Sequence, residues 1–158
     1  MSQVSVTIRH AAEKDVPIIV ELNHALFQED AGQRDPFMNL NWPQEEGHEY
    51  FSKLMRSERG LGLLAEAEGK VIGYLVGYLR HSSSLRPVKM AELESMYVRE
   101  VYRGQGVGQQ LVQKFLEWAK ERGVERVSVT AYVANERAVA FYEKLGFTAK
   151  RLTLELGL

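Results

Sequence analysis

A glycine-rich segment at residues 103–109 has the residue types and spacing that most clearly support chemistry. It reads Arg-Gly-Gln-Gly-Val-Gly-Gln, and it lies between an apolar run at 93–98 and apolar residues at helical spacing up to about residue 122. Glycines allow backbone conformations with positive φ and let a ligand touch the chain. The first turn of a helix carries unpaired N–H groups and a positive dipole end. The segment therefore predicts a phosphate or pyrophosphate site, with Arg103 as a charged donor.

The glycine spacing excludes two common phosphate-binding motifs. A P-loop needs Gly-Lys-Ser/Thr, whereas Gln109 and Gln110 follow Gly108. A dinucleotide fingerprint needs a third glycine where this chain has Gln109 or Leu111, depending on which glycine starts the motif. A dinucleotide-binding protein is therefore only a remote alternative.

The pattern that remains, Arg-x-x-Gly-x-Gly, resembles the pyrophosphate loop of the GNAT superfamily of acyl-CoA-dependent N-acyltransferases. A later stretch, in which Asn135 opens a helix that ends in Tyr-Glu-Lys-Leu-Gly-Phe at 142–147, resembles the second signature of that superfamily. Both stretches stand in the family's order, with a strand between them. The resemblance implies an N-acetyltransferase that moves acetyl from acetyl-CoA to a primary amine by direct attack in a ternary complex.

The same resemblance implies which residues hold the cofactor. In the family, pantetheine lies in a wedge between two splayed strands, and backbone N–H groups hold the pyrophosphate. The implied cofactor-binding residues are Met96, Tyr97, Val98, Arg103, Gly104, Gln105, Gly106, Val107, Gly108, Gln109, Asn135 and Tyr142. The backbone amides in this set are a better prediction than the side chains.

Acetyl transfer to an amine also requires stabilisation of an oxyanion and a proton donor for the departing thiolate. By resemblance, the amide near Met96 serves the first purpose and Tyr142 is the general acid. A phenol with a pKa of about 10 is able to protonate an alkanethiolate. The alternative is a core tyrosine that packs the last helix.

The acceptor amine must lose a proton, and two carboxylates are candidate bases. Glu92 and Glu94 lie two apart on one strand face. The resemblance makes Glu94 the first choice and Glu92 the second, since some family members have a glutamate four residues before the apolar residue that ends the strand, here Val98. A structural salt bridge, or a carboxylate that only orients the acceptor, explains either residue equally well. Because no group of histidines and carboxylates has ligand spacing, we predict no metal site.

The loop at residues 28–42 holds many apolar residues for a segment without periodicity. Phe37 and Trp42 either form a satellite cluster under the loop or, with Glu94, line the acceptor site. Residues 28–49 carry six acidic side chains against one arginine. Although solvated faces are the simpler explanation, this charge favours a small cationic amine over a protein lysine or N-terminus. A non-catalytic acyl-CoA sensor is the alternative from another class.

Composition limits the partners. The 158 residues predict one domain, 1–158, and the net charge of −1 argues against nucleic acid. The absence of cysteine excludes an acyl-cysteine intermediate.

No apolar run is long enough to span a membrane, and the first ten residues are too polar for a signal peptide, so we predict a cytoplasmic protein. A homodimer is possible through the edge of the last strand.

Secondary-structure patterns supply the elements that position these residues. Strands are predicted at 4–8, 61–66, 71–79, 90–98, 126–132 and 147–156, and helices at 15–27, 43–57, 107–122 and 135–144. The strand at 126–132 should run parallel to the strand at 90–98, because a helix connects them. This order is that of the GNAT fold, an α/β (α+β) architecture with a mixed sheet of about six to seven strands, one splayed pair and about four helices.

Overall fold

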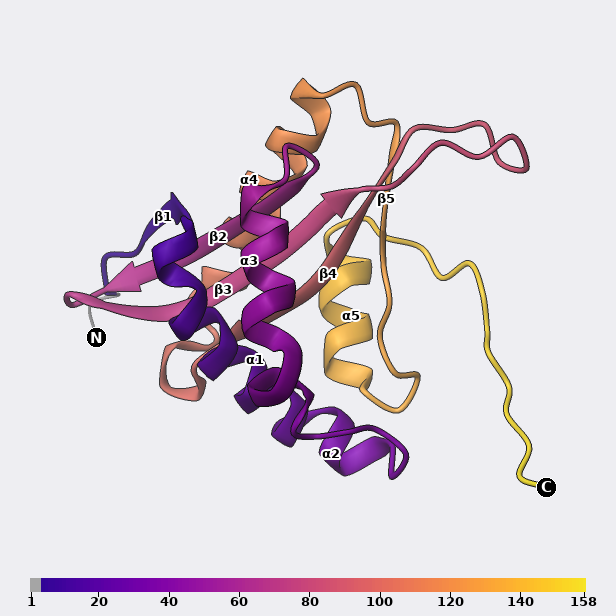
Figure 1. Ribbon diagram of the computed structural model, residues 1–158, viewed down its shortest axis with the longest axis horizontal. Coiled ribbons are helices and arrows are strands. Elements are labelled where there is room, and N and C mark those ends of the chain that lie inside the picture. Colours follow the sequence, from indigo (N-terminus) through magenta and orange to yellow (C-terminus); the bar gives the residue numbers. More distant parts are fainter. Residues whose placement is uncertain (1–3) are drawn as a thin grey trace.

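The structure is a computed structural model that describes residues 4–158, and its centre is a mixed sheet in the order β1-β2-β3-β4-β5 (Figure 1). Neighbouring strands are antiparallel except β4 and β5, which run parallel as predicted. The expected six to seven strands were wrong, because the described residues form five. The strands are β1 (Thr7–His10), β2 (Gly60–Ala67), β3 (Lys70–Leu79), β4 (Met90–Val98) and β5 (Arg126–Val129).

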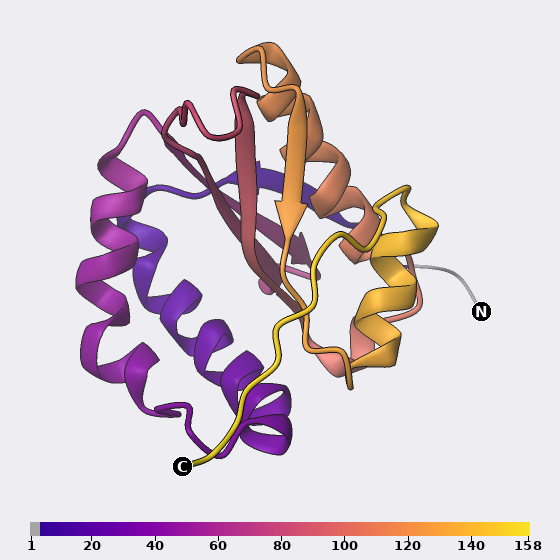
Figure 2. The same cartoon turned by 90° about the vertical axis from the view of Figure 1, so that its right-hand side faces the viewer.

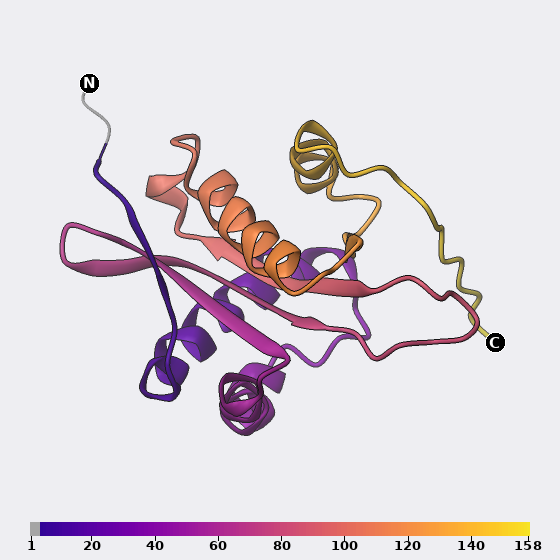
Figure 3. The same ribbon diagram turned by 90° about the horizontal axis from the view of Figure 1, so that it is seen from above.

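Helices cover both faces of the sheet. Figures 2 and 3 show α1 and α3 on one face and α4 and α5 on the other. None of the helices within residues 4–158 has the length and hydropathy of a membrane-crossing segment. The helices are α1 (Val16–Glu29), the single turn α2 (Ala31–Arg34), α3 (His48–Arg56) after a π-helical turn (Pro43–Gly47), α4 (Val107–Glu121) and α5 (Glu136–Lys144).

Two apolar clusters hold these layers together. Leu111 and Phe115, four residues apart on α4, are fully buried against one face of the sheet. Ile19 on α1 and Phe51 on α3 are buried with Tyr74 of β3 against the other face. The apolar faces of α1, α3 and α4 therefore form the core on the two sides of the sheet.

A β-bulge interrupts β4 at the position of greatest interest. Ser95 lies opposite Val76 of β3 and Leu93 lies opposite Gly77, so Glu94 is an extra residue on β4. On the other side, β4 pairs with β5 only as far as Leu93. The two parallel strands separate from that point on, which confirms the predicted splayed pair.

The C-terminal prediction was wrong. Residues 147–156 do not form a strand, and every residue of 148–158 is exposed. A strand needs a neighbour for its backbone groups, and within the described residues β5 pairs on one side only. Strand β5 also ends before residue 132, because β4 diverges from it after the bulge. The first strand lies at Thr7–His10, later than the predicted 4–8.

Candidate active site

The glycine segment forms a cradle of free backbone N–H groups at the start of α4. Gly106 is the N-cap with φ of 82°, and no side chain caps the helix. Among residues 4–158, no protein group accepts a hydrogen bond from the backbone N–H of any residue of 104–109, whereas the N–H of Gln110 bonds to Gly106 at 3.1 Å. This segment, defined here as the amide cradle (104–109), therefore has the donors and the dipole that bind an anionic group.

Arg103, which the sequence suggested as a charged donor, binds within the protein. Its Nε donates to the carbonyl of Val98 at 2.7 Å, and its guanidinium donates to both carboxylate oxygens of Glu29 at 2.5 and 2.9 Å. This hydrogen-bonded arginine lowers the pKa of Glu29. Arg103 also lies over the ring of Tyr97, 5.1 Å from its centroid. Arg103 therefore joins β4 to α1 directly before the amide cradle.

Met96, Tyr97 and Val98 lie on the part of β4 that has separated from β5. They pair with β3 on one side, and within the described residues no strand pairs with them on the other. A Cβ added to Gly108, in the first turn of α4, would lie 3.6 Å from the methyl carbon of Met96 and 3.2 Å from the ring of Phe141. The side chain of Met96 therefore reaches the start of α4. The open edge of β4 therefore adjoins the amide cradle.

Tyr142 lies on α5 with a hydroxyl that has no partner within residues 4–158. Its ring packs edge-on against Phe141 and Phe147, with centroids 5.1 and 5.5 Å away. Burial, followed by the nearby charge of Asp30, raises the pKa of Tyr142 to about 12. The phenol thus keeps its proton at neutral pH, and its hydroxyl is not committed to a structural bond.

Asn135 caps α5, as its position in the sequence suggested. Its side-chain oxygen accepts from the N–H of Ala138 at 3.2 Å, and its amide donates to Asp30 at 3.1 Å. Because Asp30 follows α1 directly, this bond connects the α5 side of the splayed strands to the α1 side. Asn135 therefore links the start of α5 to the end of α1.

The two candidate carboxylates have different environments. Glu94, at the bulge, accepts a hydrogen bond from the hydroxyl of Tyr50, and burial is the main cause of its raised pKa, to which the charge of Glu92 adds. Glu92 accepts from Ser128 of β5 at 3.0 Å and lies 4.0 Å from Arg80. Burial raises the pKa of Glu92 as well. Glu92 is thus bound into the strand pair, whereas Glu94 faces a cavity.

That cavity has a volume of about 410 Å³, and it is called the acceptor cavity after the acceptor site expected from the sequence near Trp42 and Glu94. Trp42 stacks on Phe27 at 6.0 Å and meets Tyr50 edge-on at 5.4 Å, so one wall is aromatic. Phe37, the other residue suggested from the sequence, is 88% exposed and does not line this space. The residues around the acceptor cavity are Asn23, Phe27, Met38, Asn39, Trp42, Phe51, Glu94 and Ser95.

Asn23 contributes a feature that the sequence did not reveal. The residue is 2% exposed, and its side-chain oxygen is the one buried side-chain polar atom without a partner within residues 4–158. Its amide donates to the hydroxyl of Tyr74 at 2.8 Å, and that hydroxyl donates to Ser95 at 2.8 Å. A buried carbonyl without a donor is costly, and a ligand in the acceptor cavity would supply one.

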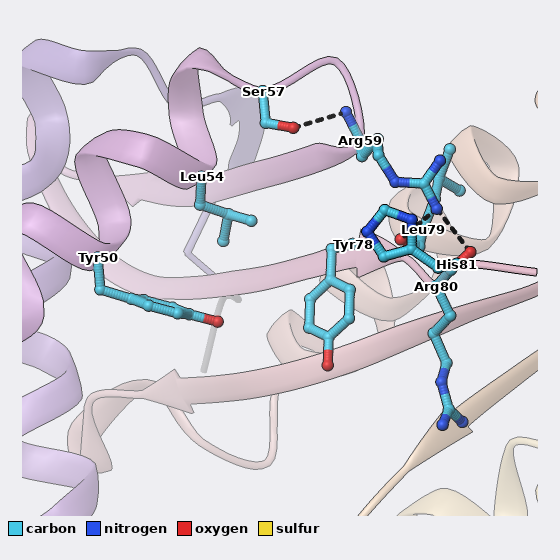
Figure 4. Close-up of a pocket in the computed structure, with 8 residues that line it drawn as sticks. All are labelled: Tyr50, Leu54, Ser57, Arg59, Tyr78, Leu79, Arg80 and His81. Carbon is cyan, nitrogen blue, oxygen red and sulfur yellow. Dashed lines mark hydrogen bonds between the residues drawn. The ribbon is translucent and has the colours of Figure 1, made fainter.

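A second cavity, of about 490 Å³, lies on the other side of Tyr50, and Figure 4 shows the side chains around it. Tyr78 points into it, and Arg59 is held at its rim by bonds to the carbonyls of Leu79 and Arg80 at 3.0 and 2.6 Å. Tyr50 lines this cavity while its hydroxyl bonds to Glu94, which lines the acceptor cavity. The Tyr50–Glu94 pair therefore stands between the two spaces.

The acidic charge of residues 28–49 is mostly engaged within the protein. Glu29 pairs with Arg103, as described above. Asp30 pairs with Arg34 at 3.0 Å, and Asp35 accepts a hydrogen bond from Tyr132 at 3.1 Å. Glu45 accepts from Asn39 at 3.0 Å. Most of this charge therefore serves structure, and the preference for a cation must be judged from the cavity itself.

The acetyltransferase (GNAT) family model matches residues 23–147, which include the amide cradle, the bulge and α5. The chain belongs to the GNAT family. An uncharacterised N-acetyltransferase of Methanocaldococcus jannaschii is 32% identical over 146 residues, which are 92% of this chain. The chain spans only 62% of the length of that archaeal protein. An N-alpha-acetyltransferase of Sulfurisphaera tokodaii is 29% identical over 146 residues, covering 89% of this chain and 78% of its own.

A solved structure has the same fold. A mutant form of the BH1408 protein of Bacillus halodurans superposes with a TM-score of 0.86 over 96% of this chain and 99% of its own, at 24% identity. The fold is therefore α+β with a five-stranded mixed sheet. Within residues 4–158 of this GNAT chain, no cluster of three or more histidine, aspartate or glutamate side chains could hold a metal ion.

Sequence reasoning about this GNAT chain missed Tyr50 and Asn23. They lie within the predicted helices at 15–27 and 43–57, and neither was among the predicted site residues. A polar residue within an apolar stripe, as Asn23 is beside Leu22, was the available signal. Periodicity gave no means of pairing Tyr50 with Glu94, which lies 44 residues away in the chain.

Proposed function

We propose that this chain is an N-acetyltransferase that transfers acetyl from acetyl-CoA to a primary amine by direct attack in a ternary complex. One juxtaposition carries the proposal: the amide cradle adjoins the open edge of β4 at Met96, and the cavity lined by Glu94 and Ser95 adjoins β4 at the bulge. Donors for an anion, an unpaired strand edge and a carboxylate beside a cavity are three parts that such a transfer uses.

The residues present fit acetyl-CoA. The free N–H groups of the amide cradle suit its pyrophosphate, and the backbone of Met96 to Val98 suits the amides of its pantetheine arm. Asn135 lies beside that opening. Because Arg103 is paired with Glu29, we assign binding of the pyrophosphate to the backbone amides before the Arg103 side chain. When bound, acetyl-CoA supplies an activated acetyl thioester.

The amide cradle can be tested with Gly106→Ala. A residue with a Cβ is strained at φ of 82°, so we expect a loss of stability of about 1 kcal/mol and weaker acetyl-CoA binding. Gly69→Ala is the matched control, because Gly69 has φ of 76° in the β2–β3 turn and equally open surroundings. Thermal melting and calorimetric titration with acetyl-CoA should give similar stability losses but weaker binding in Gly106→Ala alone. Equal binding by both variants would argue against the cradle.

Two side chains can move the protons. Glu94 accepts a proton from the amine, directly or through water, because it is the carboxylate that faces the acceptor cavity. Tyr142 donates a proton to the departing thiolate, since its pKa of about 12 keeps it protonated and its hydroxyl has no internal partner. The open edge of β4 near Met96 offers a backbone N–H for the developing oxyanion.

The acceptor cavity favours a small cationic amine. It presents the carboxylate of Glu94, the unpartnered carbonyl of Asn23 and the ring of Trp42. A primary ammonium group is attracted by all three, because it donates up to three hydrogen bonds and is drawn to aromatic faces. The cavity volume of about 410 Å³ accommodates a polyamine arm or one amino-sugar ring more readily than a folded protein surface.

A thiol-release assay with acetyl-CoA tests the proposal against polyamines, aminoglycosides, amino acids and short peptides. We expect one class of small cationic amine to exceed the peptides in kcat/KM by about tenfold or more. Robust peptide acetylation with poor activity on small amines would replace this acceptor with a protein N-terminus or lysine, and the Sulfurisphaera relative makes that the second candidate. Tight acetyl-CoA binding without turnover on any amine would favour a sensor.

A further inference from the structure

The second cavity, beside Tyr50, is lined by basic side chains. Arg59 directly precedes β2, and Arg80 and His81 directly follow β3. Figure 4 shows these three side chains on the same side of the space, away from Tyr50. Among the described residues that line the second cavity, none is an aspartate or a glutamate. The charges around this space therefore attract an anionic group.

Arg59 is held in place without losing its charge. Its Nη2 donates to the carbonyl oxygens of Leu79 and Arg80 at 3.0 and 2.6 Å. Peptide carbonyls orient a guanidinium group but carry no net charge. Within residues 4–158, no carboxylate pairs with Arg59, and its Nε and Nη1 have no hydrogen-bond partner. A fixed guanidinium with free N–H groups suits a carboxylate or a phosphate.

Polar groups lead along the sheet from the second cavity to Glu94. The hydroxyl of Tyr78, which lines the cavity, has no hydrogen-bond partner within residues 4–158. Tyr78 lies opposite Glu92 in the register of β3 and β4, and Glu94 follows two positions later on β4. Glu92 lies 4.0 Å from Arg80, but it is bound by Ser128 and does not line the cavity.

Tyr50 brings the second cavity within one hydrogen bond of Glu94. Its ring lines the cavity, and its hydroxyl donates to Oε1 of Glu94. Oε2 of Glu94 has no hydrogen-bond partner within the part of the chain that the structure describes. An ammonium group can therefore bind Oε2 while Tyr50 stays bound to Oε1. The other end of the same molecule can then reach the second cavity.

We propose that the second cavity binds an acid group of the acceptor, so that the substrate is an amine that also carries a carboxylate or a phosphate. This inference rests on the proposed function and narrows its acceptor class. The amine binds at Glu94, and the acid group binds Arg59, with Arg80 and the hydroxyl of Tyr78 beside it. A polyamine would instead place a second ammonium group beside two arginines, which disfavours it.

A thiol-release assay with acetyl-CoA tests this inference on amines of matched length that differ only at the far end. One set holds 6-aminohexanoate, 6-aminohexyl phosphate, hexylamine and 1,6-diaminohexane, and shorter and longer sets cover other separations. In at least one set, we expect an acid-ended amine to exceed the methyl-ended and ammonium-ended amines in kcat/KM by about tenfold or more. The better of the carboxylate and the phosphate identifies the acid group. Turnover of small amines without any preference for an acid end would overturn this inference and leave the proposed function in place.

Variants of the second cavity locate the acid group. Arg59→Gln should lower kcat/KM for the acid-ended amine by about tenfold or more and leave that for the methyl-ended amine within about twofold, whereas Arg59→Lys should keep part of the preference. Arg56→Gln is the matched control, because Arg56 pairs with Glu13 and does not line the cavity. If Arg59→Gln does not fold, as judged by thermal melting, Arg80→Gln serves instead and should also weaken the preference. A preference that neither variant changes would place the acid group elsewhere.

Calorimetric titration separates this inference from the proposed function. If no amine is turned over, the proposed acetyl transfer to small amines is wrong, and binding of the acid-ended amines alone decides the role of the second cavity. Binding to the original protein that is about tenfold or more tighter than to Arg59→Gln would support an anion site. Equal binding to both proteins, or no binding to either, would contradict it.

Discussion

Tyr142→Phe is expected to lower kcat by about tenfold or more and to leave the Kd for acetyl-CoA within about twofold of the original. The variant removes only the hydroxyl, which has no hydrogen-bond partner within residues 4–158, so the packing against Phe141 and Phe147 is kept. The loss should therefore fall on the chemical step. Steady-state kinetics and calorimetric titration with acetyl-CoA measure the two quantities.

The pH profile adds a second readout for Tyr142. Because burial raises its pKa to about 12, the phenol stays protonated throughout the range in which the enzyme can be assayed, so no basic limb should arise from it below about pH 10. Tyr102→Phe is the matched control, since the hydroxyl of Tyr102 bonds to Glu68 in the β2–β3 turn. Unchanged kcat in Tyr142→Phe would show that another group or water protonates the thiolate.

Glu94→Gln is expected to lower kcat/KM for the amine by about a hundredfold, within the usual range for the loss of a general base. Gln keeps the size of Glu94 and can still accept a hydrogen bond from Tyr50. Glu92→Gln is the matched control, because Glu92 is held by Ser128 across the strand pair, and we expect its effect to stay below about fivefold. A larger loss from Glu92→Gln than from Glu94→Gln would reverse the assignment.

The pH dependence identifies Glu94 more directly than the size of the loss. Glu94 must be ionised to accept the proton of the bound ammonium group, so log kcat/KM of the original protein should fall as pH decreases through the raised pKa of Glu94 and level off above it. Glu94→Gln should lack that fall. The Tyr50 hydrogen bond favours the ionised carboxylate, so Tyr50→Phe should move the change of slope to higher pH. An unmoved profile in both variants would exclude Glu94 as the base.

The stability of Glu94→Gln separates catalysis from unfolding. Burial raises the pKa of Glu94 in the folded state above its unfolded value, so the carboxyl favours folding while it is protonated and loses that contribution as pH rises through the folded pKa. Above that pKa the ionised group is therefore a cost to the fold. The uncharged variant should melt at or above the temperature of the original protein, and a marked fall would attribute its lost activity to misfolding.

Features set by neighbouring residues were predictable from the sequence. The amide cradle depends on glycines within a few positions of a helix start, the cap of α5 depends on Asn135 and Ala138, and the parallel β4–β5 pair depends on the helix between them. Local spacing determines all three, because backbone conformation, helix capping and crossover length are properties of short segments.

Features that join distant segments were decided only by the tertiary structure. The Tyr50–Glu94 bond, the pairing of Arg103 with Glu29 and the open carbonyl of Asn23 each depend on how α1 and α3 pack on β4. The alternating leucines at 152–156 identify a strand-forming sequence, but whether they form a strand depends on an edge to pair with. The sequence determines which groups are available, and packing determines which of them meet, because side-chain contacts across a sheet depend on register and layering rather than on separation along the chain.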